Sequence, residues 1–192
     1  MYEIRLHGRG GQGAVLAAGV LASAFVAEGK YAVAVPSFGF ERRGAPVAAY
    51  LRTDEREIRR MTNIYAPDCV LCIDPTVARA VNVFDGVKAG GALVQTTARR
   101  LDELRIPDQI AIVGLCDAVA IARSIFGRPI TNTIMLGAFA RTTGLVSLGA
   151  LERAIEESEF RDAGLAQNLE ALRRGFEETS VHLLKNLADA AA

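Results

Sequence analysis

A glycine-rich segment near the N-terminus constrains the fold of this chain more than any other feature. In order, its residues are Gly8, Arg9, Gly10, Gly11, Gln12 and Gly13. Three of the glycines follow a G-x-G-x-x-G pattern, which lets the backbone turn sharply, approach a ligand closely and pack a helix against a strand. The free N–H groups and positive dipole end of such a helix attract anions. The segment therefore predicts a loop that presents backbone amides to a phosphate-bearing ligand; a glycine-rich turn in a tightly packed core is the alternative.

The residues on either side of the glycine segment predict a strand before it and a helix after it. Residues 3–7 alternate in polarity as a half-buried strand does, whereas residues 13–28 are mostly Ala, Val and Leu and favour a helix. Gly29 suits the end of that helix, and residues 31–35 form a second expected strand that Pro36 stops. This order predicts a βαβ unit with a right-handed crossover.

The remainder of the chain alternates expected strands with expected helices. The expected strands cover residues 47–52, which could lie at a sheet edge, 57–59, 68–73, 92–95 and 110–113. The expected helices cover residues 116–126, 132–143, 148–157 and 163–187, of which the last could break near Gly175. This order predicts one α/β domain over residues 1–192: a Rossmann-like, open, mostly parallel, twisted sheet with helices on both faces and a helical C-terminal third.

Composition restricts the classes of partner. The 192 residues suffice for a single core, and 22 basic side chains balance 22 acidic ones. A neutral chain gives no electrostatic reason to expect nucleic acid or an anionic membrane as a partner. The sequence has no apolar run of about 20 residues and no N-terminal pattern of a signal peptide. We therefore expect a soluble, cytoplasmic protein.

The cysteines give little indication of chemistry. Three cysteines are too few for a disulfide framework, although Cys69 and Cys72 form a C-x-x-C motif within an apolar run that indicates a buried strand. Residues three apart on a strand point to opposite faces, so these thiols are expected to be structural, with redox or metal chemistry as the alternative. Because an iron–sulfur cluster usually takes four thiolates, the chain is not expected to hold one alone, and no metal ligand is assigned.

The end of the second expected strand argues against an ordinary NAD site. Such a site needs an Asp or Glu there to bind the ribose 2′-hydroxyl. The strand instead runs from Ala34 through Val35 and Pro36 into Ser37 and Phe38, and no acid is among them. An arginine close to the strand end would suit NADP, but the first arginine after the strand, Arg42, lies six residues beyond its end, which is too far.

The segment after this strand gathers aromatic rings, arginines and glycines at the edge of the sheet where open α/β folds bind ligands. In order, it contains Ser37, Phe38, Gly39, Phe40, Glu41, Arg42, Arg43 and Gly44. Arginine binds phosphate through a bidentate fork, and aromatic rings stack on purines or on guanidinium groups. The segment therefore predicts contact with a ligand or partner. A loop salt bridge between Glu41 and Arg42, or an intersubunit contact, is the structural alternative.

Four motifs in order resemble those of one known family. The glycine segment is followed by Pro36-Ser37-Phe38-Gly39 with Glu41-Arg42-Arg43-Gly44, then by Ile64-Tyr65-x-Pro67-Asp68, and then by Asp74-Pro75-Thr76. Residues 131–138 and 144–146 are also similar. Over roughly residues 3–180, the chain resembles the gamma subunit of 2-oxoacid:ferredoxin (acceptor) oxidoreductases, a family that includes pyruvate:ferredoxin oxidoreductase.

The resemblance implies a chain that works within a complex. Complexes of this family oxidatively decarboxylate a 2-oxoacid with coenzyme A to an acyl-CoA and CO2, and ferredoxin or another acceptor takes the electrons. Thiamine diphosphate and Mg2+ belong to alpha and beta subunits, and iron–sulfur (4Fe–4S) clusters belong to the beta subunit and a ferredoxin-like delta subunit. An NAD-reducing flavoprotein subunit could be a further partner. The 2-oxoacid could be pyruvate, 2-oxoglutarate, a branched-chain 2-oxoacid or an aryl 2-oxoacid.

The resemblance also implies roles for individual residues in a coenzyme A site. Coenzyme A carries a pyrophosphate and a 3′-phosphate, so its site needs cations and amides rather than the missing carboxylate. The residues expected to contact it in the glycine loop are Gly10, Gly11, Gln12 and Gly13, with Gly8 and Arg9 beside them. In the second loop, Arg42 and Arg43 are candidates for phosphate, Phe38 and Phe40 for adenine or pantetheine, and Ser37 and Gly39 complete the set. No catalytic residue is assigned to this chain.

Several further polar residues have two interpretations each. Thr131 or Asn132 could cap the helix that starts there, or Asn132 could bond to a ligand or partner. His7 is expected to make a polar contact rather than act in catalysis, and His182 is expected on the surface of the last helix. Asp74 follows a strand, where sites occur, and could equally cap the next helix.

Two other functions remain open at this stage. No pair of nucleophile and base is recognisable that would let the chain catalyse alone. A self-sufficient NAD(P)-dependent dehydrogenase on the same fold is the first alternative. A structural assembly domain with an empty glycine loop is the second.

Overall fold

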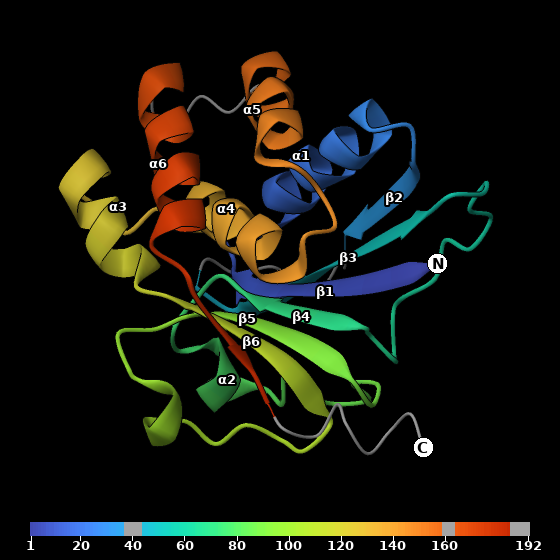
Figure 1. Cartoon of the computed structure of the whole chain (residues 1–192), viewed down its shortest axis with the longest axis horizontal. Coiled ribbons are helices and arrows are strands. Elements are labelled where there is room, and N and C mark those ends of the chain that lie inside the picture. Colours follow the sequence, from blue (N-terminus) through green and yellow to red (C-terminus); the bar gives the residue numbers. More distant parts are fainter. Residues whose placement is uncertain (37–43, 159–163, 185–192) are drawn as a thin grey trace.

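A computed structural model describes residues 1–36, 44–158 and 164–184, which build one seven-stranded sheet (Figure 1). The strands are β1 (Tyr2–Arg9), β2 (Tyr31–Pro36), β3 (Pro46–Asp54), β4 (Cys69–Cys72), β5 (Gly91–Thr96), β6 (Ile110–Cys116) and β7 (Ser180–Leu183). The helices are α1 (Ala14–Ala27), α2 (Val77–Ala80), α3 (Ala118–Phe126), α4 (Asn132–Thr143), α5 (Leu148–Glu157) and α6 (Leu165–Glu177), with a short 3-10 turn, η1 (Leu101–Glu103).

The order of the strands is β2-β3-β1-β4-β5-β6-β7. The pairs β1–β4, β4–β5 and β5–β6 are parallel, whereas β3 is antiparallel to both of its neighbours and β7 is antiparallel to β6. Because β2 and β1 both oppose β3, they run in the same direction. The described sheet is therefore mostly parallel, and the predicted α/β fold class is confirmed.

Two strand predictions near the N-terminus need correction. The strand at 47–52 exists as β3, but it lies between β1 and β2 rather than at an edge, and it pairs along its length with both. Polarity alternation identifies the faces of a strand but not its neighbours, so the sequence could not show this insertion. The prediction of a strand at 57–59 is wrong, because that stretch has no regular secondary structure. The Arg52 guanidinium holds the turn that follows by donating to the carbonyls of Thr62 (2.6 Å) and Asn63 (3.2 Å).

The prediction of one long helix over 163–187 is also wrong. Helix α6 ends at Glu177, and β7 then pairs with the far edge of β6, with Val113 opposite His182. His182 is therefore on a strand rather than a helix. A strand forms because β6 would otherwise leave its N–H and C=O groups unpaired at the sheet edge. Gly175 does not break α6 but lets it cross α4, since an added Cβ would overlap the carbonyl of Ile134.

Helices α1, α3, α4 and α5 agree with the sequence prediction to within two residues, whereas the ranges of α2 and η1 were not predicted. Helix α4 covers the predicted residues and ends at Gly144 in a left-handed conformation (φ 63°). Helix α5 is capped by the Ser147 hydroxyl, which accepts from the Ala150 N–H at 3.2 Å. Helix α3 starts two residues later than predicted, since β6 extends to Cys116 and the Asp117 carboxylate caps the helix.

The helices form two unequal layers. Helices α1, α3, α4, α5 and α6 cover one face of the sheet, and α2 with η1 lies on the other (Figure 1). The thick layer holds the larger core, in which the rings of Phe25 and Phe139 meet edge to face at 6.5 Å. Among the described residues, no helix is long and apolar enough to cross a membrane.

The two layers separate the cysteines of the C-x-x-C motif. Cys69 packs in the core beneath the thick helical layer, whereas Cys72 packs in the second core beside α2, as the spacing on a strand predicts. Burial raises the pKa of both thiols, to about 12 for Cys72. These thiols stay protonated at neutral pH, and this supports a structural role.

Candidate functional site

The parallel strands bring several loops to one edge of the sheet. The glycine loop follows the carboxyl end of β1, Asp74 follows β4, and Thr97 follows β5. Strand β2, which runs the same way, ends at Pro36 on this edge. Ligands of open α/β folds bind at this edge, near the point where the strand order reverses. The candidate site is therefore the edge that holds the glycine loop.

The glycine loop has the geometry of an anion cradle. Gly11 and Gly13 adopt left-handed conformations, with φ of 88° and 74°. Gly13 is the N-cap residue of α1, where it supplies no side-chain cap, and the first turn of the helix contains no acidic residue. The N–H groups of that first turn therefore lack a side-chain acceptor, and the positive end of the helix dipole faces the loop. An anion such as a phosphate satisfies both.

Close packing explains two of the glycines. A Cβ on Gly13 would overlap the side-chain amide of Asn132, which is buried at the start of α4. A Cβ on Gly8 would come within 3.3 Å of the Cβ of Ala14. The starts of α1 and α4 therefore meet at the glycine loop.

Thr131 and Asn132 take roles that only partly match the prediction. Thr131 is the N-cap residue of α4 by position, but its hydroxyl donates to the Ile73 carbonyl at 2.9 Å and makes no cap. The Asn132 side-chain oxygen accepts from the Thr133 N–H at 2.9 Å. A ligand bond from Asn132 stays a prediction.

The side chains of Arg9 and Gln12 face inward, and Asp74 holds both. Gln12 donates to Asp74 at 2.6 Å and accepts from the Arg9 N–H at 2.8 Å. The Arg9 guanidinium lies 3.3 Å from Asp74 and donates to the Thr76 hydroxyl at 2.8 Å and to the Gly44 carbonyl at 3.0 Å. These bonds fix the shape of the loop and occupy both side chains. The Gln12 N–H also donates to the Arg9 carbonyl at 3.0 Å, so within the described part of the chain the N–H groups of Gly11 and Gly13 are the loop donors left to meet a ligand.

Asp74 holds the glycine loop in place, whereas the sequence had offered two other roles for it, in a ligand site or as a helix cap. Burial acts to raise the pKa of its carboxyl, but hydrogen bonds from Gln12 and Thr76, with the charge of Arg9, hold the pKa below its usual value. Thr76 donates from both its N–H (2.8 Å) and its hydroxyl (2.6 Å). The signal for this role was an acid at the end of the parallel strand next to β1.

The second predicted loop lies mostly outside the described residues. Its candidates are Ser37, Phe38, Gly39, Phe40, Arg42 and Arg43, all within 37–43. The residues that follow them do contact the glycine loop: the Gly44 N–H donates to the Gly10 carbonyl at 3.0 Å, and the Gly10 N–H donates to the Ala45 carbonyl at 2.8 Å. The chain therefore returns to the glycine loop directly after the second loop.

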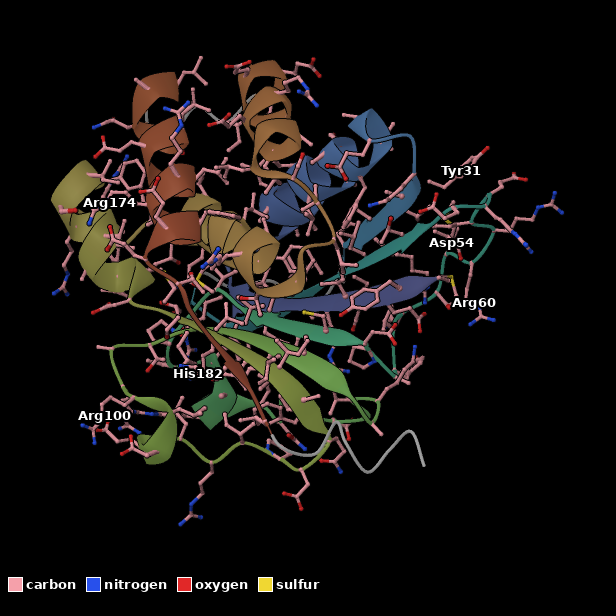
Figure 2. The ribbon with its side chains drawn as sticks, in the orientation of Figure 1. Tyr31, Asp54, Arg60, Arg100, Arg174 and His182 are labelled. Carbon is pink, nitrogen blue, oxygen red and sulfur yellow. The ribbon has the colours of Figure 1, made fainter. Side chains whose placement is uncertain are left out.

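His7 makes a polar contact, as predicted. It is buried on β1, and its Nε2 accepts from the Nε of Arg5 at 3.0 Å. Burial, and then the charge of Arg5, lower the pKa of His7 to about 4, so the ring is neutral at pH 7. His182 is partly exposed on β7, with its Nε2 3.3 Å from the Ser180 hydroxyl (Figure 2).

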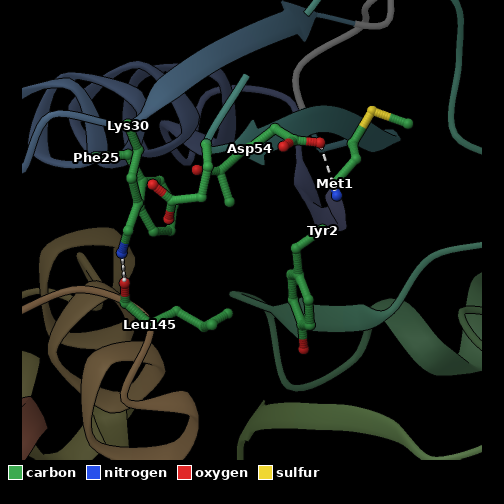
Figure 3. Close-up of a pocket in the computed structure, with 8 residues that line it drawn as sticks. Met1, Tyr2, Phe25, Lys30, Asp54 and Leu145 are labelled. Carbon is green, nitrogen blue, oxygen red and sulfur yellow. Dashed lines mark hydrogen bonds and ion pairs between the residues drawn. The ribbon is translucent and has the colours of Figure 1, made fainter. Parts of the chain in front are cut away.

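The described residues also line hollows outside the glycine loop, one far from it and one next to it. One, of about 320 Å³, is at the opposite end of β1, where the N-terminal ammonium pairs with Asp54 at 2.7 Å and Lys30 donates to the Leu145 carbonyl at 2.7 Å (Figure 3). The other, of about 380 Å³, is at the ligand-binding edge, between α2 and the segment after β5, and includes Thr76 in its wall. The second hollow adjoins the candidate site.

The sequence matches a known family over nearly its whole length. The profile of the family described as pyruvate ferredoxin/flavodoxin oxidoreductase matches residues 3–178. The chain belongs to this family. It is a gamma-type subunit of an oxidoreductase complex, as the sequence motifs implied.

Curated relatives of this family share the full length of the chain. The gamma subunit of NADH-dependent phenylglyoxylate dehydrogenase from Aromatoleum evansii is 64% identical over 190 residues, which is 99% of this chain and 100% of the relative. The common gamma subunit of pyruvate/ketoisovalerate oxidoreductases from Thermococcus litoralis is 46% identical over 186 residues, covering 96% of this chain and 100% of the relative.

Solved structures of the family share the fold. The pyruvate oxidoreductase subunit PORC of Thermotoga maritima is 38% identical, with a TM-score of 0.80 over 94% of this chain and 97% of that one. A 2-oxoglutarate:ferredoxin oxidoreductase from Magnetococcus marinus, solved with 2-oxoglutarate, coenzyme A and succinyl-CoA bound, has a TM-score of 0.73 at 20% identity. The match covers 91% of this chain and 30% of that one, and at this identity it shows the shared fold alone.

Proposed function

We propose that this chain is the gamma subunit of a complex that oxidises an aryl 2-oxoacid such as phenylglyoxylate. The observation that carries the proposal is the 64% identity to a phenylglyoxylate dehydrogenase gamma subunit over 99% of the chain, against 46% for subunits of pyruvate/ketoisovalerate enzymes. The name of that relative also favours a nicotinamide nucleotide over ferredoxin as the final electron acceptor. An NAD-reducing partner subunit would then accompany the alpha, beta and delta subunits.

The overall reaction follows from the chemistry of a 2-oxoacid. Phenylglyoxylate loses its carboxylate as CO2, and the remaining acyl carbon bonds to the sulfur of coenzyme A as two electrons leave. The thiol proton is released, and NAD+ takes up the two electrons and one proton to form NADH. Thiamine diphosphate with Mg2+ and the 4Fe–4S clusters belong to partner subunits in this proposal, and the described residues of this chain contain no group of three or more metal-ligating side chains.

The contribution of this chain is to hold coenzyme A. The uncapped first turn of α1 and the N–H groups of Gly11 and Gly13 suit the pyrophosphate, because they offer donors beside a positive dipole end, whereas the N–H groups of Gly10 and Gln12 are bonded to the carbonyls of Ala45 and Arg9. Arg42 and Arg43 would add charge from the second loop, and Phe38 and Phe40 would pack on adenine or pantetheine. The contacts of Gly44 and Ala45 with Gly10 support a single site built from both loops.

The activity can be tested on the complex that co-purifies with this chain. We expect reduction of NAD+ that requires both phenylglyoxylate and coenzyme A, with kcat/KM for phenylglyoxylate well above that for pyruvate or 2-oxoglutarate. A higher kcat/KM for pyruvate would overturn the substrate. A lone, colourless chain that reduces NAD without partners would overturn the subunit role and favour a self-sufficient dehydrogenase.

A further inference from the structure

The hollow between α2 and the segment after β5 is lined by arginines and by no acidic side chain among the described residues. Its wall includes three arginines: Arg79 from α2, Arg99 from the turn after β5, and Arg105 from the stretch that follows η1. No Asp or Glu is among the described residues that line it. The whole chain is electrically balanced, with 22 basic and 22 acidic residues, so this hollow is a local concentration of positive charge.

The three guanidinium groups are available to an outside anion. None of them forms an ion pair with a described carboxylate, and all three residues are exposed. Their neighbour Arg100 behaves differently, since it pairs with Asp102 at 2.8 Å. Figure 2 shows Arg100 beside η1. Arginines gathered without acids repel one another, and an anion with several acceptor oxygens relieves that repulsion.

The hollow also offers neutral groups that suit the rest of a ligand. Gln95 can donate hydrogen bonds from its wall, and Phe84 contributes an aromatic ring. A volume of about 380 Å³ is within the range for small-molecule sites. An anionic group attached to a small organic body therefore fits better than an extended polymer.

The hollow and the glycine loop share a wall. Thr76 lines the hollow, its hydroxyl accepts from Arg9 at 2.8 Å, and the same hydroxyl donates to Asp74 at 2.6 Å. Asp74 in turn accepts from Gln12 of the glycine loop at 2.6 Å. Thr76 is therefore bonded directly to Arg9 and, through Asp74, to Gln12, and one ligand with two separate phosphate groups could reach both the loop and the hollow.

We propose that this arginine hollow binds a phosphate monoester, and that the monoester is the 3′-phosphate of coenzyme A. The assignment rests on the proposed function, in which the glycine loop binds the pyrophosphate of the same molecule. A 3′-phosphate carries close to two negative charges near neutral pH and presents three acceptor oxygens, which match several arginine forks. The hollow then lets the complex distinguish coenzyme A from dephospho-coenzyme A, which differs only by that phosphate.

The test compares these two thiols as substrates of the assembled complex. The quantity measured is the ratio of KM for dephospho-coenzyme A to KM for coenzyme A. We expect a ratio above about 10 in the wild-type complex, since dephospho-coenzyme A cannot form the charge-assisted hydrogen bonds that the 3′-phosphate makes. Each of R79Q, R99Q and R105Q should lower the ratio severalfold, and the triple variant should bring it close to one.

Arg100 supplies the matched control. R100Q makes the same change of charge one position from Arg99, but Arg100 is paired with Asp102 and does not line the hollow. The ratio should therefore stay at its wild-type value in R100Q. A ratio that falls equally in R99Q and R100Q would overturn the assignment, as would a triple variant that keeps the wild-type preference.

A binding measurement separates this proposal from the proposed function. Titration of the complex with adenosine 3′,5′-bisphosphate should show binding that the triple variant loses and R100Q keeps. A complex that forms no acyl-CoA but shows this pattern would contradict the proposed function and the coenzyme A assignment, while the phosphate monoester site would stand. Equal binding by the wild-type and triple-variant complexes would overturn the site itself.

Discussion

Replacement of Gly13 by alanine tests two claims about the glycine loop at once. Gly13 has a φ of 74°, a left-handed conformation that costs an L-residue about 1–2 kcal/mol. The new methyl group would also overlap the buried side-chain amide of Asn132, and overpacking of this kind costs about 1–3 kcal/mol. We therefore expect G13A to lower the free energy of unfolding by about 2–5 kcal/mol.

Gly29 provides a matched control for the backbone part of that cost. Its φ is 80°, but an added Cβ would have no heavy atom within 4 Å. G29A should therefore lose only the conformational part, about 1–2 kcal/mol. The assay is urea unfolding of the purified chain, with the slope of the transition checked for each variant.

A double mutant isolates the contact with Asn132. N132A removes the amide that the new methyl group would strike, so G13A/N132A should be less destabilised than the sum of the single variants by 1 kcal/mol or more. Additive effects, or a G13A variant no less stable than G29A, would refute the packing argument. The loop would then tolerate side chains, and its glycines would need another explanation.

Four further predictions concern the site and the packing. R42E or R43E should raise KM for coenzyme A severalfold in an intact complex while decarboxylation without coenzyme A persists; an unchanged KM would remove these arginines from the site. D74N should weaken the hydrogen bonds that hold Gln12 and Thr76. Because the folded state lowers the pKa of Asp74, the wild type loses stability as acid protonates this carboxyl, and D74N should lack that loss; unfolding free energies at pH 7 and pH 3 check this. For His7, the folded pKa of about 4 lies below the unfolded value, so stability is complete above pH 6.5 and falls by up to about 3 kcal/mol towards pH 4; H7Q should flatten this slope. G175A should destabilise by about 1–3 kcal/mol, because its methyl group would strike the Ile134 carbonyl; a neutral variant would contradict the close crossing of α4 and α6.

The sequence correctly predicted the helices and strands whose ends are set by nearby residues, such as caps and turns. Helix α4 has its predicted limits because Gly144 provides a left-handed stop, and α5 begins where Ser147 caps it. The buried strands β4, β5 and β6 appear because their apolar runs are short and bounded by turns. In each case the deciding interaction is within a few residues of the element, so the sequence displays it.

The sequence did not predict the features that depend on pairing with strands far away along the chain. Residues 180–183 form a strand only because the edge of β6, some 65 positions earlier, offers it hydrogen bonds. The insertion of β3 between β1 and β2 is likewise a matter of pairing rather than of pattern. In the site, the clamp from Asp74 to Gln12 joins residues 62 apart, so the sequence showed the two groups but not their contact.

The placement of Cys69 and Cys72 on opposite faces of β4 makes them separate reporters of the two helical layers. Each thiol is buried, and a reagent that requires a thiolate can reach it only when the layer above opens. Cys69 becomes accessible when the thick layer of α1 and α4 lifts, and Cys72 when the thinner covering around α2 lifts. The order in which an alkylating agent modifies them would record which side of the sheet unfolds first, without any engineered probe.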